Sequence, residues 1–346
     1  MDILMLAPIP PPSGGIASWT MRFIEYCDLE HVSLRIVNIA LQGERATKEI
    51  MKRSIQVEFK RNIKILINLR QEIRKKRPDI VHINTSCSPF GVLRDALCVF
   101  ITYGKAPIVL HCRCNIEDQI GLSRLPRLVF RYLVKKSEKV IVLNKFSMKY
   151  VNNIDLKKAV FIPDFVNDKM IENSHQINDK INNIVYVGHI ERAKGIYQIV
   201  DVAKKMPSIN FILVGAIRED LSKIEFTSNI TFAGRVNSDD VKKYLQEADV
   251  FLFPSMSEGF SNALLEAMAM GLPVIASDVG ANREMIEDKG GVILEKNDSV
   301  HIINAIKFLC DTKIRKAMSE WNTKKVRGEY MMDIVMGKYF DLYNSI

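Results

Sequence analysis

The sequence lacks any apolar run that approaches the roughly 18 residues needed for a membrane-spanning helix. Its first residues, MDILMLAPIPPP, also lack the basic segment and the long apolar stretch of a secretory signal. They favour a first buried strand instead. With neither a membrane-spanning helix nor an export signal, we expect the chain in the cytoplasm. Peripheral binding to the inner face of the plasma membrane is compatible with this expectation.

Cysteine is also scarce, with six among 346 residues, and in the cytoplasm we expect all six as reduced thiols. No group of them has the spacing of a zinc site. Cys112 and Cys114 lie in a strand-like run, and we expect them to face opposite ways and to form no metal pair. Ser238 is expected to cap a helix whose dipole the following Asp239 and Asp240 complement. The sequence therefore predicts no metal ion and no cofactor.

Acidic residues are few in the amino-terminal half. Residues 1–165 contain 27 Lys and Arg against 15 Asp and Glu, a net charge of +12, whereas the remainder has 22 against 25, a net charge of −3. This excess predicts an anionic surface or ligand for the first half. Nucleic acid is not the favoured partner, because the basic residues lack the interleaved aromatic side chains of single-strand binders and no DNA-reading motif is present.

Two segments hold much of that positive charge. Arg45 to Arg77 is helical in pattern, and Leu122 to Lys139, LSRLPRLVFRYLVKKSEK, reads as a basic amphipathic helix. Such a helix can lie in the interface of an anionic bilayer, where Arg124, Arg127, Arg131 and Lys135 would contribute. The alternative is a helix that packs on a sheet and leaves a solvated basic face.

Short apolar runs that alternate with helical patterns are present along the whole chain, and they predict parallel βαβ units. We therefore expect an α/β protein with two doubly wound domains. The predicted divisions are a first domain at 1–166, a polar linker at 167–182, a second domain at 183–327 and a last helical segment at 328–346.

The most informative stretch runs from Val250 to Asp278. It contains a buried strand ending at Phe253, a loop with Glu258 and Gly259, a helix capped by Ser261 or Asn262, and a second buried strand. In such a unit the loop lies at the carboxyl end of its strand, where ligands bind in open sheets. The N–H groups at the start of the helix suit a phosphate, and Gly259 lets the backbone approach closely.

Two carboxylates, Glu258 and Glu266, bracket this phosphate-binding corner with seven residues between them. A diphosphate would repel them, so we expect both to bind hydroxyls, one towards each end of a nucleotide sugar. The alternative is an ordinary α/β unit with two solvated glutamates. A second phosphate-capable corner is Gly14-Gly15, which follows a proline-rich loop and precedes a helix. Its spacing is that of neither a P-loop nor a dinucleotide site.

These residues resemble the signature of the family-4 retaining glycosyltransferases. That signature has the form EGFxNxxLEAMAxGxPVIAxxxGxxxE. The match runs from Glu258 through Glu266 to Gly280 and Glu284. Weaker matches extend the resemblance over nearly the whole chain. The resemblance implies the GT-B fold, in which two Rossmann-like domains face each other across a cleft, and a final segment that crosses back to the first domain.

The resemblance also implies roles for individual residues. Glu258 and His111 would hold the transferred sugar, and Glu266 the ribose. The donor diphosphate would lie in a cradle formed by Gly14, Gly15 and the amides near Phe260, Ser261 and Asn262. Arg235 and Val236 would hold the nucleobase, largely through backbone groups.

The segment Gly188 to Gly195 resembles the family phrase GRxxxxKG, whose Arg and Lys clamp the donor phosphates. Lys194 is in register with the family lysine, but His189 stands where the arginine is expected. Either His189 binds as an imidazolium, or Arg192 reaches the phosphate in its place.

The implied activity is metal-independent, retaining transfer of a sugar from a nucleotide diphosphate sugar, with a UDP-sugar favoured. The acceptor would be a glycan or a lipid-linked molecule in bacterial surface polysaccharide biosynthesis. By resemblance, the acceptor attacks on the face from which the phosphate departs, and a donor phosphate oxygen takes its proton. The alternative is a catalytically silent GT-B subunit that stabilises a partner transferase, towards which His189 points.

Overall fold

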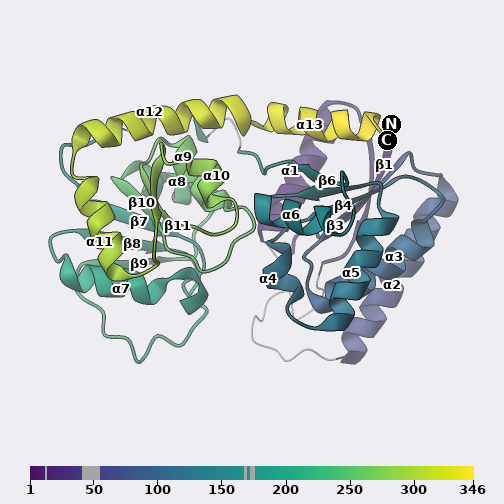
Figure 1. The fold of residues 1–346 in the computed structure, drawn as a ribbon, viewed down its shortest axis with the longest axis horizontal. Helices are drawn as coiled ribbons and strands as arrows, with labels where there is room; N and C mark the ends of the chain where they lie inside the picture. Colours follow the sequence, from purple (N-terminus) through teal and green to yellow (C-terminus); the bar gives the residue numbers. More distant parts are fainter. Residues whose placement is uncertain (12–13, 41–54, 167–169, 172–175) are drawn as a thin grey trace. The chain divides into compact units, whose positions relative to one another are not determined.

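The computed structural model describes residues 1–346 except for 12–13, 41–54, 167–169 and 172–175. The chain forms two compact units, each built on one parallel sheet of six strands (Figure 1). Unit 1 consists of residues 1–162 together with 339–346, and unit 2 consists of residues 163–338. The prediction of two doubly wound α/β domains is confirmed. Among the described residues, no helix is both long and apolar enough to cross a membrane.

The sheet of unit 1 has the strand order β2-β1-β3-β4-β5-β6, and every neighbouring pair is parallel. Its strands are β1 (Asp2–Ala7), β2 (Ser33–Asn38), β3 (Ile80–Thr85), β4 (Ile108–Cys112), β5 (Lys139–Val142) and β6 (Ala159–Phe161). Strands β1, β3 and β4 are buried throughout, which explains their nearly continuous apolar sequences.

The helices of unit 1 cover the sheet on both faces. They are α1 (Gly15–Leu29), α2 (Ile55–Lys75), α3 (Pro89–Thr102), α4 (Ile116–Ile120), α5 (Arg124–Lys136) and α6 (Lys145–Asn152). The step from β1 to β2 runs opposite to the later steps, so right-handed crossovers put α1 on one face and α2, α3 and α5 on the other. The predicted helix Arg45–Arg77 is observed from Ile55 onwards, and its residues 45–54 lie outside the described residues.

The sheet of unit 2 has the order β12-β11-β10-β7-β8-β9, again all parallel. Its strands are β7 (Asn183–Val187), β8 (Asn210–Val214), β9 (Ile230–Gly234), β10 (Val250–Phe253), β11 (Val274–Ser277) and β12 (Gly291–Leu294). Its helices are α7 (Ile196–Lys205), α8 (Ser238–Gln246), α9 (Asn262–Ala269), α10 (Asn282–Ile286), α11 (Ser299–Phe308) and α12 (Thr312–Glu329). Helix α13 (Met332–Asn344) begins in unit 2 and ends in unit 1.

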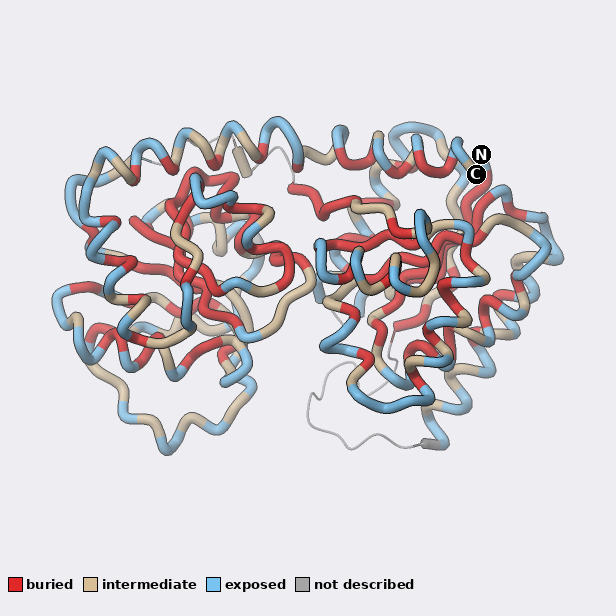
Figure 2. Tube along the Cα trace, in the orientation of Figure 1, coloured by how far each residue is buried: buried red, intermediate tan, exposed pale blue. Residues whose placement is uncertain are grey.

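The core of each unit lies around its central strands, which Figure 2 shows as buried. In unit 1, Leu4 and Leu6 of β1 and Val81 and Ile83 of β3 belong to one hydrophobic cluster. Helix α5 contributes its buried side to this cluster, through Phe130 and neighbouring residues. Helix α5 therefore packs on the sheet and leaves its basic side exposed, and contact of that side with a bilayer stays a prediction.

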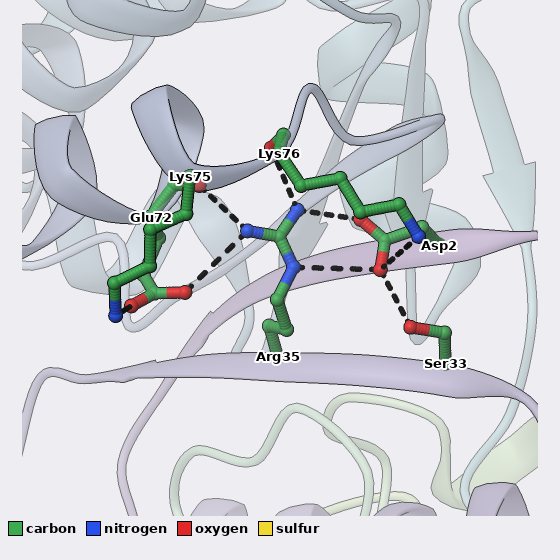
Figure 3. A network of polar contacts seen from close by, with 6 residues as sticks. All are labelled: Asp2, Ser33, Arg35, Glu72, Lys75 and Lys76. Carbon is green, nitrogen blue, oxygen red and sulfur yellow. Dashed lines mark hydrogen bonds and ion pairs between the residues drawn. The ribbon is translucent and has the colours of Figure 1, made fainter.

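A polar network closes the amino-terminal edge of the unit 1 sheet (Figure 3). The Arg35 guanidinium lies 2.5 Å from Asp2 Oδ2 and donates to the Glu72 carbonyl oxygen at 2.6 Å, while Ser33 Oγ donates to Asp2 Oδ1 at 2.6 Å. Burial alone would raise the pKa of the Asp2 carboxyl, but hydrogen bonds from Arg35 and Ser33 hold the pKa below its usual value. This edge is occupied by structural ion pairs, whereas the loops with the predicted site residues leave from the opposite, carboxyl edge.

The caps of two helices show how local side chains set the boundaries. Ser261 caps α9, because its hydroxyl accepts from the Leu264 N–H at 3.2 Å. The prediction that Ser238 caps α8 is wrong. Asn237 is the cap, since its side-chain oxygen accepts from the Asp240 N–H at 2.9 Å. Both residue types cap well, and the sequence alone does not show which one keeps the extended backbone.

Candidate active site

The candidate site of unit 2 lies where its strand order reverses. From β7 the chain proceeds through β8 and β9 in one direction, and β10 then returns to the other side of β7. The loops after β7 and β10 therefore diverge from neighbouring strands at the carboxyl edge of the sheet. In open α/β sheets this reversal point is where ligands bind.

Lys194 and Glu258, one from each of these loops, form an ion pair at this point. Lys194 Nζ lies 2.6 Å from Glu258 Oε1 and 3.5 Å from the Ser257 carbonyl oxygen. The two side chains retain 23% and 12% of their exposure, so the pair is half-buried and still reachable from solvent. The structure thus brings together the two residues that the sequence separately assigns to the phosphate and to the sugar.

Gly195 allows the two loops to touch. Its φ is +85°, in the left-handed region, and it follows the short 3-10 helix Arg192–Lys194. A Cβ at this position would overlap the carbonyl oxygen of Pro254 and lie 2.7 Å from its Cγ. The Met256 N–H also donates to the Ala193 carbonyl oxygen at 2.9 Å. The Lys194 turn therefore lies directly on the strand end that leads to Glu258.

Gly280 supports the Glu258 loop from the other side. Its φ is +55°, and a Cβ there would lie 2.5 Å from the Glu258 carbonyl oxygen. Next to it, the Ala281 N–H donates to the Gly259 carbonyl oxygen at 3.1 Å. The backbone at Glu258 and Gly259 is thus held between the loops that follow β7 and β11, which fixes the direction of the carboxylate.

Helix α9 starts directly after this loop and carries the remaining residues of the predicted motif. Phe260 is buried, and its ring contacts Tyr330 with centroids 5.9 Å apart. Asn262 is the first residue of α9, and Glu266 is half-buried one turn further along. The first amides of α9 are therefore at the same sheet edge as Lys194, in the arrangement predicted for an anion.

The other predicted residues of the β7 loop are Gly188, His189 and Arg192, which precede Lys194 in the chain. Gly188 has φ +156°, and a Cβ there would lie 2.5 Å from Tyr186 Oη, which donates to the His189 carbonyl oxygen at 2.7 Å. His189 is half-buried and Arg192 is exposed. The Arg192 guanidinium lies 5.7 Å from the centre of the Tyr197 ring. Both remain candidates for the second phosphate ligand.

Residues at two further strand ends complete the predicted set. Arg235 and Val236 follow β9, one of the two edge strands of the unit 2 sheet, and Arg235 is exposed. In unit 1, Gly14 is the cap of α1 and Gly15 is its first residue, and the Ser18 N–H donates to the Gly14 carbonyl oxygen at 2.9 Å. The φ of Gly14 is 177°, so its backbone is extended.

His111, in β4, lies in a buried chain of polar side chains. Its Nε2 lies 3.2 Å from Arg113 Nη1, and its Nδ1 lies 3.2 Å from His82 Nε2. His82 Nδ1 is in turn 2.6 Å from Tyr343 Oη, at the end of α13. A guanidinium can only donate, so the His111 proton is on Nδ1, the His82 proton is on Nδ1, and each ring donates to the next group.

The imidazoles of this chain are neutral. Burial lowers the pKa of His82 to about 3, and burial, with the Arg113 charge, lowers the pKa of His111 well below its usual value. Both ring nitrogens of His111 are engaged, so His111 Nε2 can accept a hydrogen bond from a sugar hydroxyl only if Arg113 releases it. The sequence reasoning missed His82, Arg113 and Tyr343. The histidine inside the apolar run Ile80–Thr85 could have indicated this chain of hydrogen bonds, because a buried polar side chain needs a hydrogen-bond partner.

The three cysteines Cys87, Cys112 and Cys114 lie together in unit 1, a grouping that the sequence reasoning did not foresee. The expectation that Cys112 and Cys114 face opposite ways is wrong, because residues two apart in an extended chain point to one side and both thiols reach Cys87. Burial would raise the pKa of the Cys87 thiol, but hydrogen bonds with the other two thiols lower it to about 6. Within the described ranges, no group of three or more His, Cys, Asp or Glu residues has the geometry to hold a metal ion.

Comparison with protein-family models gives a match that begins near the middle of the chain. Residues 167–325, which include the β7 and β10 loops, match the model described as glycosyl transferases group 1. Among curated proteins, the capsular polysaccharide biosynthesis glycosyltransferase CapM of Staphylococcus aureus is 27% identical over 258 residues, which cover 71% of this chain and 65% of the relative. The UDP-Gal:alpha-D-GlcNAc-diphosphoundecaprenol alpha-1,3-galactosyltransferase of Escherichia coli is 26% identical over 82% of this chain and 79% of its own.

Solved structures agree over the full length of the chain. The sucrose-phosphate synthase of Thermosynechococcus elongatus has a TM-score of 0.78 at 17% identity and covers 100% of this chain and 99% of its own. The Anabaena protein HepE, in a complex with UDP and glucose, has a TM-score of 0.76 at 15% identity, with 100% of both chains covered. At these identities the likeness defines the fold, which is GT-B with two Rossmann-like units.

Proposed function

The chain belongs to the glycosyl transferases group 1 family, and on that premise we propose that it transfers a sugar from a nucleotide diphosphate sugar to a glycan or lipid-linked acceptor. A UDP-sugar is the favoured donor. Transfer retains the anomeric configuration and needs no metal ion. In this proposal the enzyme acts in bacterial surface polysaccharide biosynthesis. The name of the Staphylococcus aureus relative, which refers to capsular polysaccharide biosynthesis, supports this assignment.

The observation that carries the proposal is the ion pair of Lys194 and Glu258 at the point where the unit 2 sheet reverses. An ammonium has three N–H donors, so Lys194 can bind a diphosphate oxygen while it still donates to Glu258. A carboxylate has two oxygens, and Glu258 can accept from a sugar hydroxyl with Oε2. One half-buried pair thus positions the leaving group and the transferred sugar together.

The remaining residues have supporting roles in this proposal. The amides at the start of α9 bind the diphosphate, and Glu266 accepts from the ribose hydroxyls. His189 or Arg192 supplies the second positive charge, and Gly188 lets the backbone approach. From unit 1, Gly14 and Gly15 bind the donor diphosphate and His111 binds the transferred sugar. For this, Arg113 must release its hydrogen bond to His111 Nε2. Arg235 and Val236 bind the base.

The chemistry needs few protein groups. An acceptor oxygen bonds to the anomeric carbon while the bond from that carbon to the diphosphate oxygen breaks. The acceptor proton passes to the departing diphosphate, so no protein side chain has to serve as the base. Lys194 stabilises the negative charge that develops on the diphosphate, which is where fixed charges accelerate such reactions most.

Two observations bear on the acceptor and on the alternative. The Escherichia coli relative is named for a diphosphoundecaprenol acceptor, which supports a lipid-linked acceptor here. The alternative of a catalytically silent subunit that stabilises a partner transferase rests on His189 in place of the family arginine. It predicts nucleotide binding without turnover by the chain alone.

The test of donor choice is a thermal-shift panel with UDP, GDP, ADP and CMP. At 100 times its dissociation constant, a ligand stabilises the folded state by about 2.7 kcal/mol, and we expect UDP to give the largest shift. The variant Glu266→Gln should lose part of the UDP shift, whereas Glu247→Gln, at an exposed position after α8, should keep it.

Slow release of UDP from a UDP-sugar by the purified chain should accompany binding. A shift with no release would favour the silent subunit, and no shift with any nucleotide would contradict donor binding.

The second expected result concerns metal ions. Because Lys194 supplies the positive charge that a metal ion would otherwise place beside the diphosphate, we expect unchanged turnover after EDTA treatment. The measurement compares sugar transfer before and after chelation, at the same free donor concentration. Activity that disappears in EDTA and returns with Mg²⁺ or Mn²⁺ would show that Lys194 does not fill this role.

A further inference from the structure

Helix α3 buries its two charged residues among apolar ones such as Val92, Cys98 and Val99, and it exposes large apolar side chains instead. Its two charged residues, Arg94 and Asp95, retain 7% and 0% exposure and pair with each other, with Arg94 Nη2 2.7 Å from Asp95 Oδ1. A helix on a sheet normally buries its apolar stripe and exposes its charges. Here both charged side chains are buried and lose their hydration. Their ion pair offsets part of the free energy of that desolvation.

The outward side of α3 is apolar along its whole length. Phe90, Leu93, Leu97 and Phe100 are exposed by 60%, 39%, 50% and 75%. Their spacing of three, four and three residues puts them in one stripe on the helix surface. A contiguous exposed patch of large apolar side chains is unusual on a protein surface in water and marks an interaction site.

Helix α5 packs beside α3 and adds positive charge to the same side of the sheet (Figure 1). Its exposed residues include Leu125 and Leu128, with exposures of 61% and 63%, and the cations Arg124, Arg131 and Lys135. The Lys136 ammonium lies 4.1 Å from the centre of the Tyr103 ring, just after α3. We call Phe90, Leu93, Leu97, Phe100, Leu125 and Leu128, with these cations, the α3–α5 face. Helix α2, which packs on the other side of α3, also exposes Phe59, Ile63 and Ile67.

Charge decides which partner fits this face. Helix α5 contains no acidic residue, and the acid of α3 is buried, so the exposed charges of the two helices are all positive. A second copy of the same face would bring like charges together and be repelled. An anionic bilayer interface offers negative headgroups for the cations and an apolar layer for the leucines and phenylalanines.

We propose that the α3–α5 face docks onto an anionic membrane surface, with Leu97 and Phe100 inserted below the headgroups and Arg124, Arg131 and Lys135 among them. This deepens the proposed function and rests on it for its purpose, because docking places the protein at a lipid-linked acceptor. Tyr103 and Lys136 form an aromatic and basic pair of the kind that stays at the level of the headgroups.

The test is flotation of the purified full chain with phosphatidylglycerol vesicles and with phosphatidylcholine vesicles, at low and high salt. We expect binding to the anionic vesicles that weakens with salt. The double variant Leu97→Ser/Phe100→Ser should lower the vesicle partition coefficient by at least about tenfold, since two large apolar side chains no longer leave water. The variant Arg124→Glu/Arg131→Glu/Lys135→Glu should lower it at least as much. Arg127 is left unchanged because its Nε donates to the Gly121 carbonyl oxygen.

The matched control is Leu156→Ser/Phe308→Ser, which removes a leucine and a phenylalanine of comparable exposure from elsewhere on the chain. It should bind vesicles like the parent. All variants should retain the UDP-induced thermal shift, so that loss of docking is distinguishable from failure of donor binding. The proposal is overturned by equal binding to neutral and anionic vesicles or by no binding at low salt. It is also overturned by a solution dimer, detected by light scattering, that the Leu97→Ser/Phe100→Ser change dissociates without affecting vesicle binding.

Discussion

Replacing Lys194 with alanine is expected to lower the rate of sugar transfer by on the order of 10²–10³, the usual effect of losing one fixed group that stabilises transition-state charge. The ammonium lies 2.6 Å from Glu258 and in reach of the proposed diphosphate position. The measurement is single-turnover transfer at saturating donor, so that the loss appears in the chemical step. Turnover equal to that of the parent would remove Lys194 from the phosphate site.

Two further variants separate charge stabilisation from damage to the site. Lys194→Ala leaves a half-buried Glu258 without its cation, which destabilises the fold by about 1–3 kcal/mol. The double variant Lys194→Ala/Glu258→Gln should recover that stability but not the rate, because the phosphate ligand is still missing. The control Lys204→Ala removes an exposed lysine of α7, 3.9 Å from Glu225, and should keep the full rate.

Gly195→Ala is expected to produce the second large effect, although the side chain added is a single methyl group. The new Cβ would overlap the carbonyl oxygen of Pro254, and the left-handed φ of +85° adds strain. Overpacking of this kind costs about 1–3 kcal/mol. Relief of the overlap moves the Lys194 turn away from the Glu258 loop, and a displacement of about 1 Å at a reacting site can cost on the order of 10²-fold in rate.

The measurements for Gly195→Ala are thermal unfolding and turnover. The matched control is Gly337→Ala within α13, where the backbone is helical and no atom beyond the helix's own neighbouring backbone lies within 4 Å of the added Cβ. That change should stabilise the helix by about 1 kcal/mol and leave turnover unaltered. If Gly195→Ala were as stable and as active as Gly337→Ala, the close approach at Pro254 would have no part in positioning the site.

The local features of the site could be predicted from the sequence because short-range physics determines them. The unit β10–α9–β11 was predictable because buried parallel strands are continuous apolar runs, and because a capping serine acts within three residues. The loops that carry Lys194 and Glu258 were placed at strand ends for the same reason. Their ion pair was not foreseen, since it joins residues 64 positions apart and depends on the order of the strands.

Long-range pairings account for what the sequence reasoning missed. The hydrogen bond between His82 and Tyr343 joins residues 261 positions apart, and no periodicity reports it. Helix α3 was ambiguous for another reason. Its sequence, PFGVLRDALCVFIT, is apolar on almost every side, so the pattern did not indicate that Arg94 and Asp95 would be buried. Burial of this pair became evident only from the packing of the helix.

The two ends of the chain belong to the same unit, which has a consequence for protein synthesis. Tyr339 packs on Trp19 and Phe23, and Tyr343 accepts from His82, yet both tyrosines are translated after the whole of unit 2. When residues 1–162 have left the ribosome, the aromatic cluster around Trp19 and the hydrogen-bonded chain from Arg113 to His82 still lack their last members. Domains usually complete their folding in the order of translation. In this chain unit 1 emerges first but can complete its folding only after residues 339–346 are synthesised. Unit 2 is contiguous in sequence and can complete its folding before them.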